Sequence, residues 1–109
     1  MKFHVIFSPE AEKQLIDLYW YIAEEGSPST ALRYTDAIVD YCESLSEFPH
    51  RGHTRDDIRA GLRITNYRKT AVIAFDVDGK SVSIVGIFYG GQDYEKILLG
   101  DADDSGSNN

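Results

Sequence analysis

The chain has 109 residues, of which 42% are apolar and 12% aromatic, enough for one hydrophobic core and too few for two ordinary domains. Its formal net charge of −7 opposes nonspecific binding to nucleic acid, in which lysine and arginine neutralise the phosphates. No apolar run approaches membrane-spanning length, and no basic leader precedes an apolar segment, so we expect a soluble cytoplasmic protein without membrane association.

Most of the cations fall in a short stretch of this acidic chain. Residues 1–48 have a net charge of −6, whereas residues 49–69 have a net charge of +4. The cations of the second stretch are Arg51, Arg55, Arg59, Arg63, Arg68 and Lys69. Clustered charge of one sign focuses the electric field and favours encounter with an anionic partner. The alternative is a solvated loop whose surface ion pairs contribute little stability.

The first elements are a strand and a helix. In residues 2–7 the apolar side chains of Phe3, Val5 and Phe7 fall at alternate positions, on one side, which predicts a strand. Ser8 and Pro9 are typical of a helix start, and Gly26 is typical of a helix end. The apolar stripe between them consists of Ala11, Leu15, Leu18, Tyr19 and Ile22. We therefore expect a helix with one buried face.

A second helix follows at once. Ser27 and Pro28 repeat the start signal, apolar residues recur every three or four positions to about Phe48, and Pro49 ends the pattern. The connection between the two helices is so short that they must run antiparallel, as a hairpin.

The rest of the chain predicts a loop and three strands. Residues 50–60 lack periodicity and hold most of the basic stretch, which indicates a loop. Strands are expected near residues 61–65, 69–77 and 81–89, which are rich in β-branched and aromatic side chains. Asp78 followed by Gly79 is a strong hairpin signal. The three strands should therefore be sequential and antiparallel.

The order strand, helix, helix, strand, strand, strand predicts an α+β fold in which a helical hairpin covers one face of an antiparallel sheet. The first strand must pair with a later one, because a lone strand leaves its backbone polar groups unsatisfied. Residues 94–99 suggest a short helical turn or an edge segment. The domain should span residues 1–99, and the polar, acidic residues 100–109 should be disordered.

Two aromatic groups are candidate binding residues. Residues 19–21 are all aromatic, so one of them must face away from the helical stripe, and Trp20 is a favoured interface anchor. Tyr67 precedes two cations, Arg68 and Lys69, and an aromatic ring beside cations can stack on a base. Packing in the core is the competing interpretation for Tyr67.

Metal and cofactor chemistry have little support in the sequence. His50 and His53 are close together but lack a third ligand at a plausible spacing. The single cysteine, Cys42, falls on an apolar helix face and is expected in the core. No catalytic triad, phosphate loop or paired carboxylate motif is present, so we expect no cofactor and no metal.

Several motifs in order give a family resemblance over about residues 3–98. They are SPEA at the first helix, FP-x-x-G after the second, GLR opening the next strand, a tyrosine, VDG at the hairpin and a last strand that closes in a short polar turn. With these motifs the sequence resembles the ParE branch of the RelE/ParE toxins of bacterial type II toxin–antitoxin systems. The resemblance implies a helical hairpin on an antiparallel sheet.

The resemblance implies one of two activities. RelE-like members cleave mRNA on the ribosome with cationic and aromatic side chains, whereas ParE-like members poison DNA gyrase and are held inactive by a ParD-type antitoxin. Many relatives carry a turn close to H-G-R-R-D after the last strand. Here Tyr89 replaces the histidine, and Gly91 and Gln92 replace the arginines. The loss of these cations weakens the nuclease interpretation.

We therefore expect a non-enzymatic, ParE-like toxin that binds DNA gyrase and forms a hetero-oligomer with its antitoxin. The alternatives are a ribosome-dependent mRNA endonuclease and a degenerate member that mainly binds its antitoxin. The antitoxin is expected across the helical hairpin and the open sheet edge, with acidic residues near Arg59 or Arg63. The candidate partner-binding residues are Trp20, Arg55, Arg59, Arg63, Tyr67, Arg68, Lys69 and Tyr89.

Overall fold

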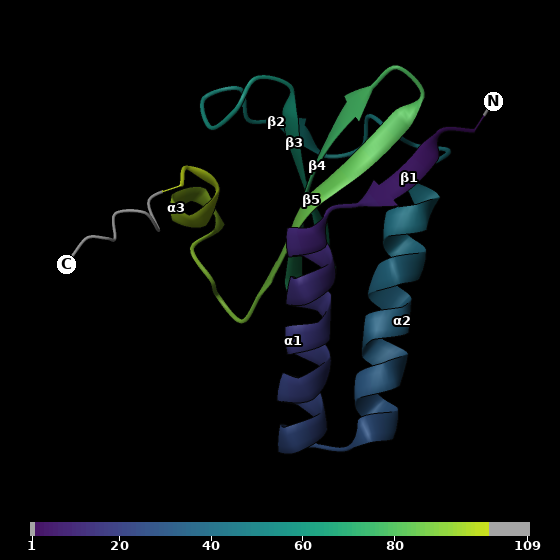
Figure 1. Cartoon of the computed structure of the whole chain (residues 1–109), viewed down its shortest axis with the longest axis vertical. Helices are drawn as coiled ribbons and strands as arrows, with labels where there is room; N and C mark the ends of the chain where they lie inside the picture. Colours follow the sequence, from purple (N-terminus) through teal and green to yellow (C-terminus); the bar gives the residue numbers. More distant parts are fainter. Residues whose placement is uncertain (1, 101–109) are drawn as a thin grey trace.

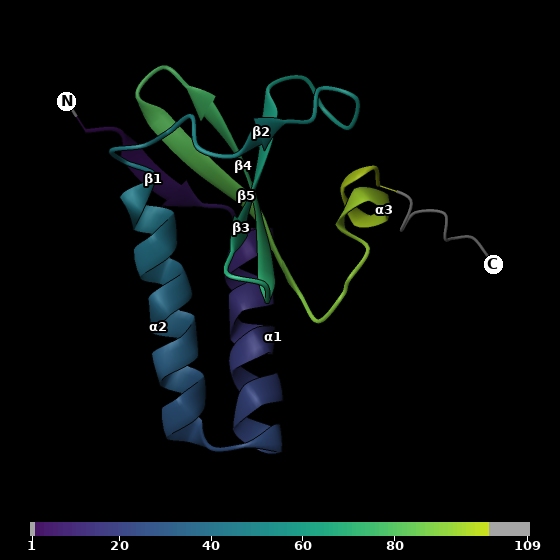
Figure 2. The same ribbon diagram turned by 180° about the vertical axis from the view of Figure 1, so that it is seen from behind.

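The structure is a computed structural model that describes residues 2–100. Its elements are β1 (His4–Phe7), α1 (Pro9–Glu25), α2 (Pro28–Ser44), β2 (His53–Thr54), β3 (Leu62–Tyr67), β4 (Ala71–Asp78), β5 (Ser81–Tyr89) and α3 (Tyr94–Leu98). Helices α1 and α2 run side by side along one side of the sheet, and α3 lies apart from them (Figures 1 and 2). The predicted α+β fold is confirmed. Within residues 2–100 no helix is long and apolar enough to cross a membrane.

The sheet has five strands in the order β1-β5-β4-β3-β2. Strands β3, β4 and β5 are sequential and antiparallel, as predicted. The predicted pairing of the first strand with a later one is also found, but β1 runs parallel to β5 and makes the sheet mixed. Parallel pairing is possible for β1 because the helical hairpin and strands β2 to β4 lie between it and β5 in the chain, which leaves ample length for the crossover. The short β2, within the predicted loop, pairs only with Arg63 and Ile64 of β3.

Local capping signals define the helical hairpin. The Ser8 hydroxyl accepts a hydrogen bond from the Ala11 N–H at 3.0 Å, and the Ser27 hydroxyl accepts one from the Thr30 N–H at 3.2 Å. The second helix was expected to reach Phe48, but it ends at Ser44. Its last residues tighten into turns bonded three residues back, such as the Leu45 N–H to the Cys42 carbonyl at 3.0 Å.

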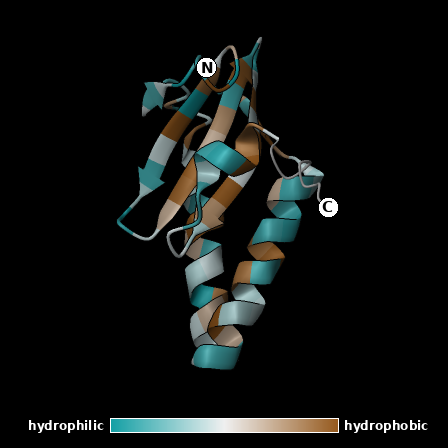
Figure 3. Ribbon diagram, turned by 90° about the vertical axis from the view of Figure 1, so that its left-hand side faces the viewer, coloured by the Kyte–Doolittle hydropathy of each residue, from teal (hydrophilic) through white to brown (hydrophobic). Residues whose placement is uncertain are grey.

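Both faces of the sheet are buried, which gives the chain two apolar clusters. The larger cluster lies between the sheet and the helical hairpin and contains Leu18, Ile38, Leu45, Phe75 and Ile84 among its buried residues. The smaller cluster, on the other face, is built on Leu62, Ile64, Ala74 and Phe88 and includes the partly buried Tyr94 and Leu98. Hydrophobic and hydrophilic segments alternate along α1 and α2, as expected for helices buried on one side (Figure 3).

A β-bulge in β5 allows this strand to contribute to both clusters. Ala74 pairs with Gly86 and Phe75 pairs with Ile84, so Val85 is the extra residue in β5. Glycine fits best at position 86, because a Cβ there would lie 2.5 Å from the ring of Phe88. The bulge therefore shifts the alternation of apolar side chains between the two faces.

The strand boundaries differ from the predicted ones by a few residues. Strand β3 extends to Tyr67 and β4 begins at Ala71, so Arg68 and Lys69 both lie in the turn, although Lys69 was expected to begin the strand. The predicted hairpin at Asp78 and Gly79 is present, with Gly79 at a φ of 60°. Of the two alternatives for residues 94–99, the structure shows the helical turn. The predicted acidic tail lies mostly outside the described residues.

Gly52 should be essential for docking the loop before β2 onto β3. It has a φ of +81°, and an added Cβ would lie 2.2 Å from the Ile64 carbonyl oxygen. We expect Gly52→Ala to lower the free energy of unfolding by about 2 kcal/mol or more, from the left-handed backbone and the clash together. Urea denaturation measures the change.

Gly61→Ala is the matched control, because Gly61 has almost the same φ, +80°, with no atom within 4 Å of an added Cβ. It should show only the backbone penalty, about 1 kcal/mol. Equal losses in the two variants would contradict the close approach of Gly52 to β3.

Candidate partner-binding site

The structure distributes the candidate binding residues over four places. Trp20 lies on α1, and Arg55 and Arg59 lie in the loop between β2 and β3. Arg63 lies within β3. The other four gather near the β3–β4 turn and the end of β5: Tyr67, Arg68, Lys69 and Tyr89. The sequence-predicted set is therefore several separate features.

Helix α1 presents aromatic and aliphatic side chains to solvent. Trp20 is 58% exposed and lies edge-on to Tyr19, with ring centroids 5.1 Å apart. Ile16, one helical turn earlier, is 56% exposed. Tyr21 is also exposed, and the centroid of its ring lies 6.2 Å from that of the Tyr89 ring. Two of the three consecutive aromatics therefore lie at the surface of α1.

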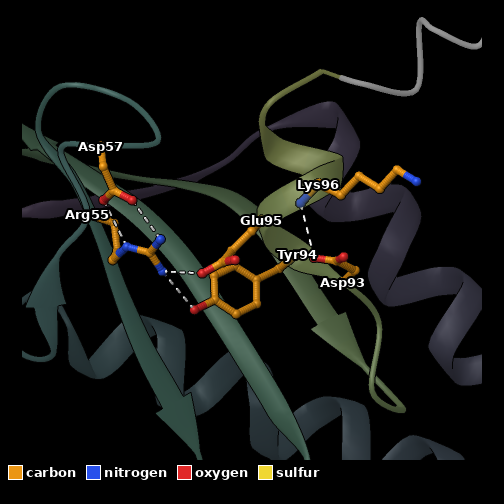
Figure 4. A network of polar contacts seen from close by, with 6 residues as sticks. All are labelled: Arg55, Asp57, Asp93, Tyr94, Glu95 and Lys96. Atoms are coloured by element: carbon orange, nitrogen blue, oxygen red, sulfur yellow. Dashed lines mark hydrogen bonds and ion pairs between the residues drawn. The ribbon is translucent and has the colours of Figure 1, made fainter.

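Arg55 joins the loop before β3 to α3. Its guanidinium binds Asp57 in a two-pronged ion pair at 2.8 and 2.9 Å, and it binds Glu95 at 2.7 Å. It also donates to the Tyr94 hydroxyl at 3.2 Å. Figure 4 shows the guanidinium between Asp57 on its own loop and the two α3 side chains. Arg55 therefore has a structural role that holds α3 over the second face of the sheet. We call its contacts with Asp57, Tyr94 and Glu95 the Arg55 clamp.

The titration of this network follows from its hydrogen bonds. The hydrogen bonds that Arg55 donates to Asp57 and Glu95 raise its pKa above the usual value. The hydrogen bond from Arg55 lowers the pKa of Asp57. This ion pair therefore contributes its full stability above the ordinary carboxyl pKa, and that stability is lost as the pH falls through the lowered pKa of Asp57. In α3 itself, the Asp93 carboxylate accepts from the Lys96 N–H at 3.1 Å (Figure 4). The ion pair between Arg55 and Asp57 is therefore intact at neutral pH.

Two further arginines of the basic stretch have internal contacts. The Arg63 guanidinium donates to the backbone carbonyls of His50, Arg51 and Gly52. Arg51 lies over the rings of Tyr41 and Phe48, at 5.2 and 5.0 Å. These cations stabilise the loop that follows α2, and Arg63 in particular satisfies its carbonyl groups.

Arg59 differs from these neighbours. Within residues 2–100 its side chain has no hydrogen bond or ion pair, and it is exposed. It lines a cavity of about 380 Å³ on the second face of the sheet, whose floor includes Val85 and Phe88 and whose wall includes Ile97. Glu10, at the start of α1, also lines the cavity. Arg59 therefore offers a free cation at the rim of a partly apolar groove.

Tyr67 belongs to a cluster of tyrosines beneath α2. Its ring lies 6.3 Å from that of Tyr34 and 5.3 Å from that of Tyr41. The Tyr41 and Thr65 hydroxyls are hydrogen-bonded at 2.8 Å. Tyr67 is only partly exposed, and Arg68 lies over its ring at 5.4 Å. The geometry favours packing over base stacking for Tyr67, because protein groups already occupy its neighbourhood.

Tyr89 lies at the end of β5, before the glycine-containing turn. Burial raises the pKa of its phenol, which reduces its capacity to act as a general base at neutral pH. Its backbone N–H donates to the Gln92 side-chain carbonyl at 2.9 Å, which holds the turn. Tyr89 and Lys69 line one cavity of about 170 Å³. Gln92 therefore has a structural role in this turn.

Residues 2–100 contain no group of three or more histidine, cysteine or acidic side chains arranged to hold a metal ion. His50 and His53 are both exposed. Cys42 is fully buried in the larger apolar cluster, and burial raises the pKa of its thiol to about 12. Cys42 is therefore a core residue rather than a reactive thiol.

Sequence reasoning missed the positions of three residues: Gln14, Glu95 and Arg33. Gln14 accepts from the Ile87 N–H at 2.7 Å, beside the bulge, and its position between Ala11 and Leu18 on the apolar stripe could have signalled an internal hydrogen bond. The role of Glu95 in the Arg55 clamp had no local signal. The position of Arg33, which lines a cavity beside the β3–β4 turn, also had no local signal in the sequence.

Removing the Arg55 guanidinium should release α3. We expect Arg55→Ala to reduce amide protection against hydrogen exchange at Ile97 and Leu99 several-fold, while β4 and β5 remain protected, because the clamp holds α3 alone. These amides donate within the helical turn at 3.1 and 3.0 Å. Arg59→Ala is the control, since it removes a cation from the same loop without breaking a side-chain contact. Unchanged protection in Arg55→Ala would contradict the clamp.

Comparison with known proteins adds to this geometry. A family model for the ParE toxin of type II toxin–antitoxin systems matches residues 5–94. Among solved structures, the chain is similar to one from the chromosomal ParDE system of P. aeruginosa, with a TM-score of 0.71, 21% identity and coverage of 81% of this chain and 96% of that one. It is also similar to one from the toxin–antitoxin complex RelBE2 of Mycobacterium tuberculosis, with a TM-score of 0.60, 22% identity and coverage of 83% and 100%. No curated protein matches the sequence.

The structural likenesses support the fold, and the family match carries the assignment. Residues 5–94 run from β1 through the helical hairpin and the rest of the sheet to the first residue of α3. The chain therefore belongs to the family of ParE toxins of type II toxin–antitoxin systems.

Proposed function

We propose that this ParE-family toxin acts by binding: it inhibits DNA gyrase and is neutralised by a ParD-type antitoxin in a hetero-oligomer. The observation that carries the proposal is the family match over residues 5–94. The similar chains come from a ParDE system and from a RelBE2 toxin–antitoxin complex, which is consistent with an antitoxin partner.

The geometry gives little support to RNA cleavage. Phosphodiester cleavage needs an acid, a base and a cation around one reacting phosphate. The candidates near the sheet are Arg63, Tyr67, Arg68, Lys69 and Tyr89. Arg63 is engaged with backbone carbonyls, Tyr67 is packed in a tyrosine cluster, and the raised pKa of Tyr89 opposes a role as base. Binding is therefore the better-supported activity.

The proposed antitoxin surface combines the helical hairpin with the second face of the sheet. Trp20 and Ile16 provide exposed apolar anchors on α1. Arg59 provides a free cation above the groove floored by Phe88. Of the two arginines expected to meet acidic antitoxin residues, Arg59 fits better, because the Arg63 guanidinium already donates to three carbonyl groups.

Purified toxin should inhibit gyrase-catalysed supercoiling and trap cleaved DNA, because the proposed toxin acts on the enzyme–DNA complex. The measurement is agarose-gel separation of plasmid topoisomers, with and without a proteolytic step that reveals protein-linked breaks. Preincubation with the antitoxin encoded beside the toxin gene should restore supercoiling. Normal supercoiling without trapped breaks would reject gyrase as the target.

Two further readouts separate the alternatives. New 5′ ends in translated mRNA, detected by primer extension, would indicate a ribosome-dependent endonuclease. Normal growth after expression without antitoxin, with intact antitoxin binding, would indicate a degenerate member that mainly binds its antitoxin.

Charge reversal at Arg59 should weaken the antitoxin complex. We expect Arg59→Glu to raise the dissociation rate about tenfold, because an acidic antitoxin residue would then meet a carboxylate. Surface plasmon resonance with the neighbouring antitoxin measures the rate. Lys2→Glu, a reversal at an exposed residue paired with Glu47 at 3.6 Å, is the matched control. Equal rates for Arg59→Glu and the unmodified toxin would place the antitoxin elsewhere.

A further inference from the structure

A second groove lies between α2 and the β3–β4 turn, on the sheet face opposite to that of Arg59. It has a volume of about 240 Å³, and α2 contributes Thr30, Arg33, Tyr34 and Ala37 to its lining. The sheet side contributes Tyr67 and Arg68. Two guanidinium groups from separate elements therefore border one groove, which we name the Arg33–Arg68 groove.

The walls of this groove are tied to one another. The Tyr34 hydroxyl donates to the Thr70 hydroxyl, which links α2 to the β3–β4 turn. Tyr34 and Tyr67 pack edge to face, with an interplanar angle of 75°. Arg68 lies over the Tyr67 ring on the turn itself. These contacts fix α2 and the β3–β4 turn relative to one another, so the walls of the groove need little rearrangement when a ligand binds.

Both arginines lack an ionic partner within the described chain. Neither Arg33 nor Arg68 forms an ion pair or a side-chain hydrogen bond in residues 2–100, whereas Arg55 and Arg63 make several such contacts. The first turn of α2 also has no acidic residue, so the positive end of its dipole adds to the potential near Thr30. The groove is thus a local positive site on an acidic chain.

The backbone at Arg68 indicates that its side chain is the important feature. Arg68 has a φ of 54° and is the one non-glycine residue with positive φ in the described chain. Glycine or asparagine adopts this conformation more readily than arginine. An arginine held there by a turn suggests a function for the guanidinium that offsets the unfavourable backbone.

We propose that the Arg33–Arg68 groove binds a glutamate or aspartate side chain of a partner protein, with a neighbouring apolar side chain against Ala37 and the tyrosine rings. Guanidinium groups match carboxylates in geometry and charge, and two of them flank the space. A nucleic-acid strand is less favoured, because nine acidic residues in the first 48 positions oppose a polyanion. The inference rests on the part of the proposed function in which the toxin acts by binding proteins.

The test titrates the full chain, labelled with ¹⁵N, with an acetylated peptide of alternating glutamate and leucine. We expect the Arg33 and Arg68 Nε–H signals and the Thr70 amide to shift, and a matched glutamine–leucine peptide to bind at least about tenfold more weakly. Arg33→Ala and Arg68→Gly should each weaken the glutamate peptide about tenfold. Arg68→Gly suits the positive φ, so its loss of binding cannot be attributed to unfolding. Lys96→Ala, which removes an exposed cation on α3, should bind normally.

Equal affinity for the glutamine peptide would overturn the proposal, as would unchanged binding by Arg33→Ala and Arg68→Gly. Tighter binding of a single-stranded thymidine oligonucleotide would assign the groove to phosphate instead. Peptide binding without gyrase inhibition would keep the groove and reject gyrase as the target. Gyrase inhibition without peptide binding would do the opposite, so the two proposals fail separately.

Discussion

Strand β5 must bury apolar side chains on both faces, and the rest of the fold is arranged around that requirement. It is flanked by β1 and β4, with Ile84 and Ile87 toward the helical hairpin and Phe88 toward the second face. The bulge at Val85 makes this division possible because it adds one residue between the two alternations. A sheet with two apolar faces needs two covering layers.

The two layers are held by different forces. The helical hairpin covers a broad apolar surface and is stabilised by burial. The second layer is a five-residue helix with no fully buried residue, too small to remain docked through burial alone. Arg55, held on its own loop by Asp57, provides the missing attachment through Tyr94 and Glu95. The same clamp removes one cation from the surface available to partners.

The division of arginines between structure and surface changes the meaning of the charge pattern. The sequence shows an evenly spaced series of four, which suggests one cationic face. In the structure Arg51, Arg55 and Arg63 contact rings, carboxylates and carbonyl groups, respectively. Arg59 alone of this series is free within the described chain. Net charge by segment therefore overstates the positive potential that a partner meets.

Sequence could predict the features that depend on neighbouring residues. Ser8 and Ser27 cap helices through contacts three positions away, and Gly79 serves a local turn, so these signals sufficed. The end of α2 was missed because Phe48 continues the apolar spacing although the backbone has already tightened into turns. The hydrogen bond from Ile87 to Gln14 joins residues 73 positions apart. The position of Gln14 on the apolar stripe indicates an internal hydrogen bond but not its partner, because the partner depends on which surfaces meet.

The positions of the free cations constrain how partners can approach. Arg59 lies on the second face of the sheet, whereas Arg33 and Arg68 lie on the face covered by the helical hairpin. One compact partner cannot contact both faces of a sheet through a flat interface. Both sites can be occupied at once only by a segment that passes around the sheet edge, or by two separate proteins. The two-residue β2 leaves most of the outer edge of β3 without a strand beside it in residues 2–100, which provides a path for such a segment.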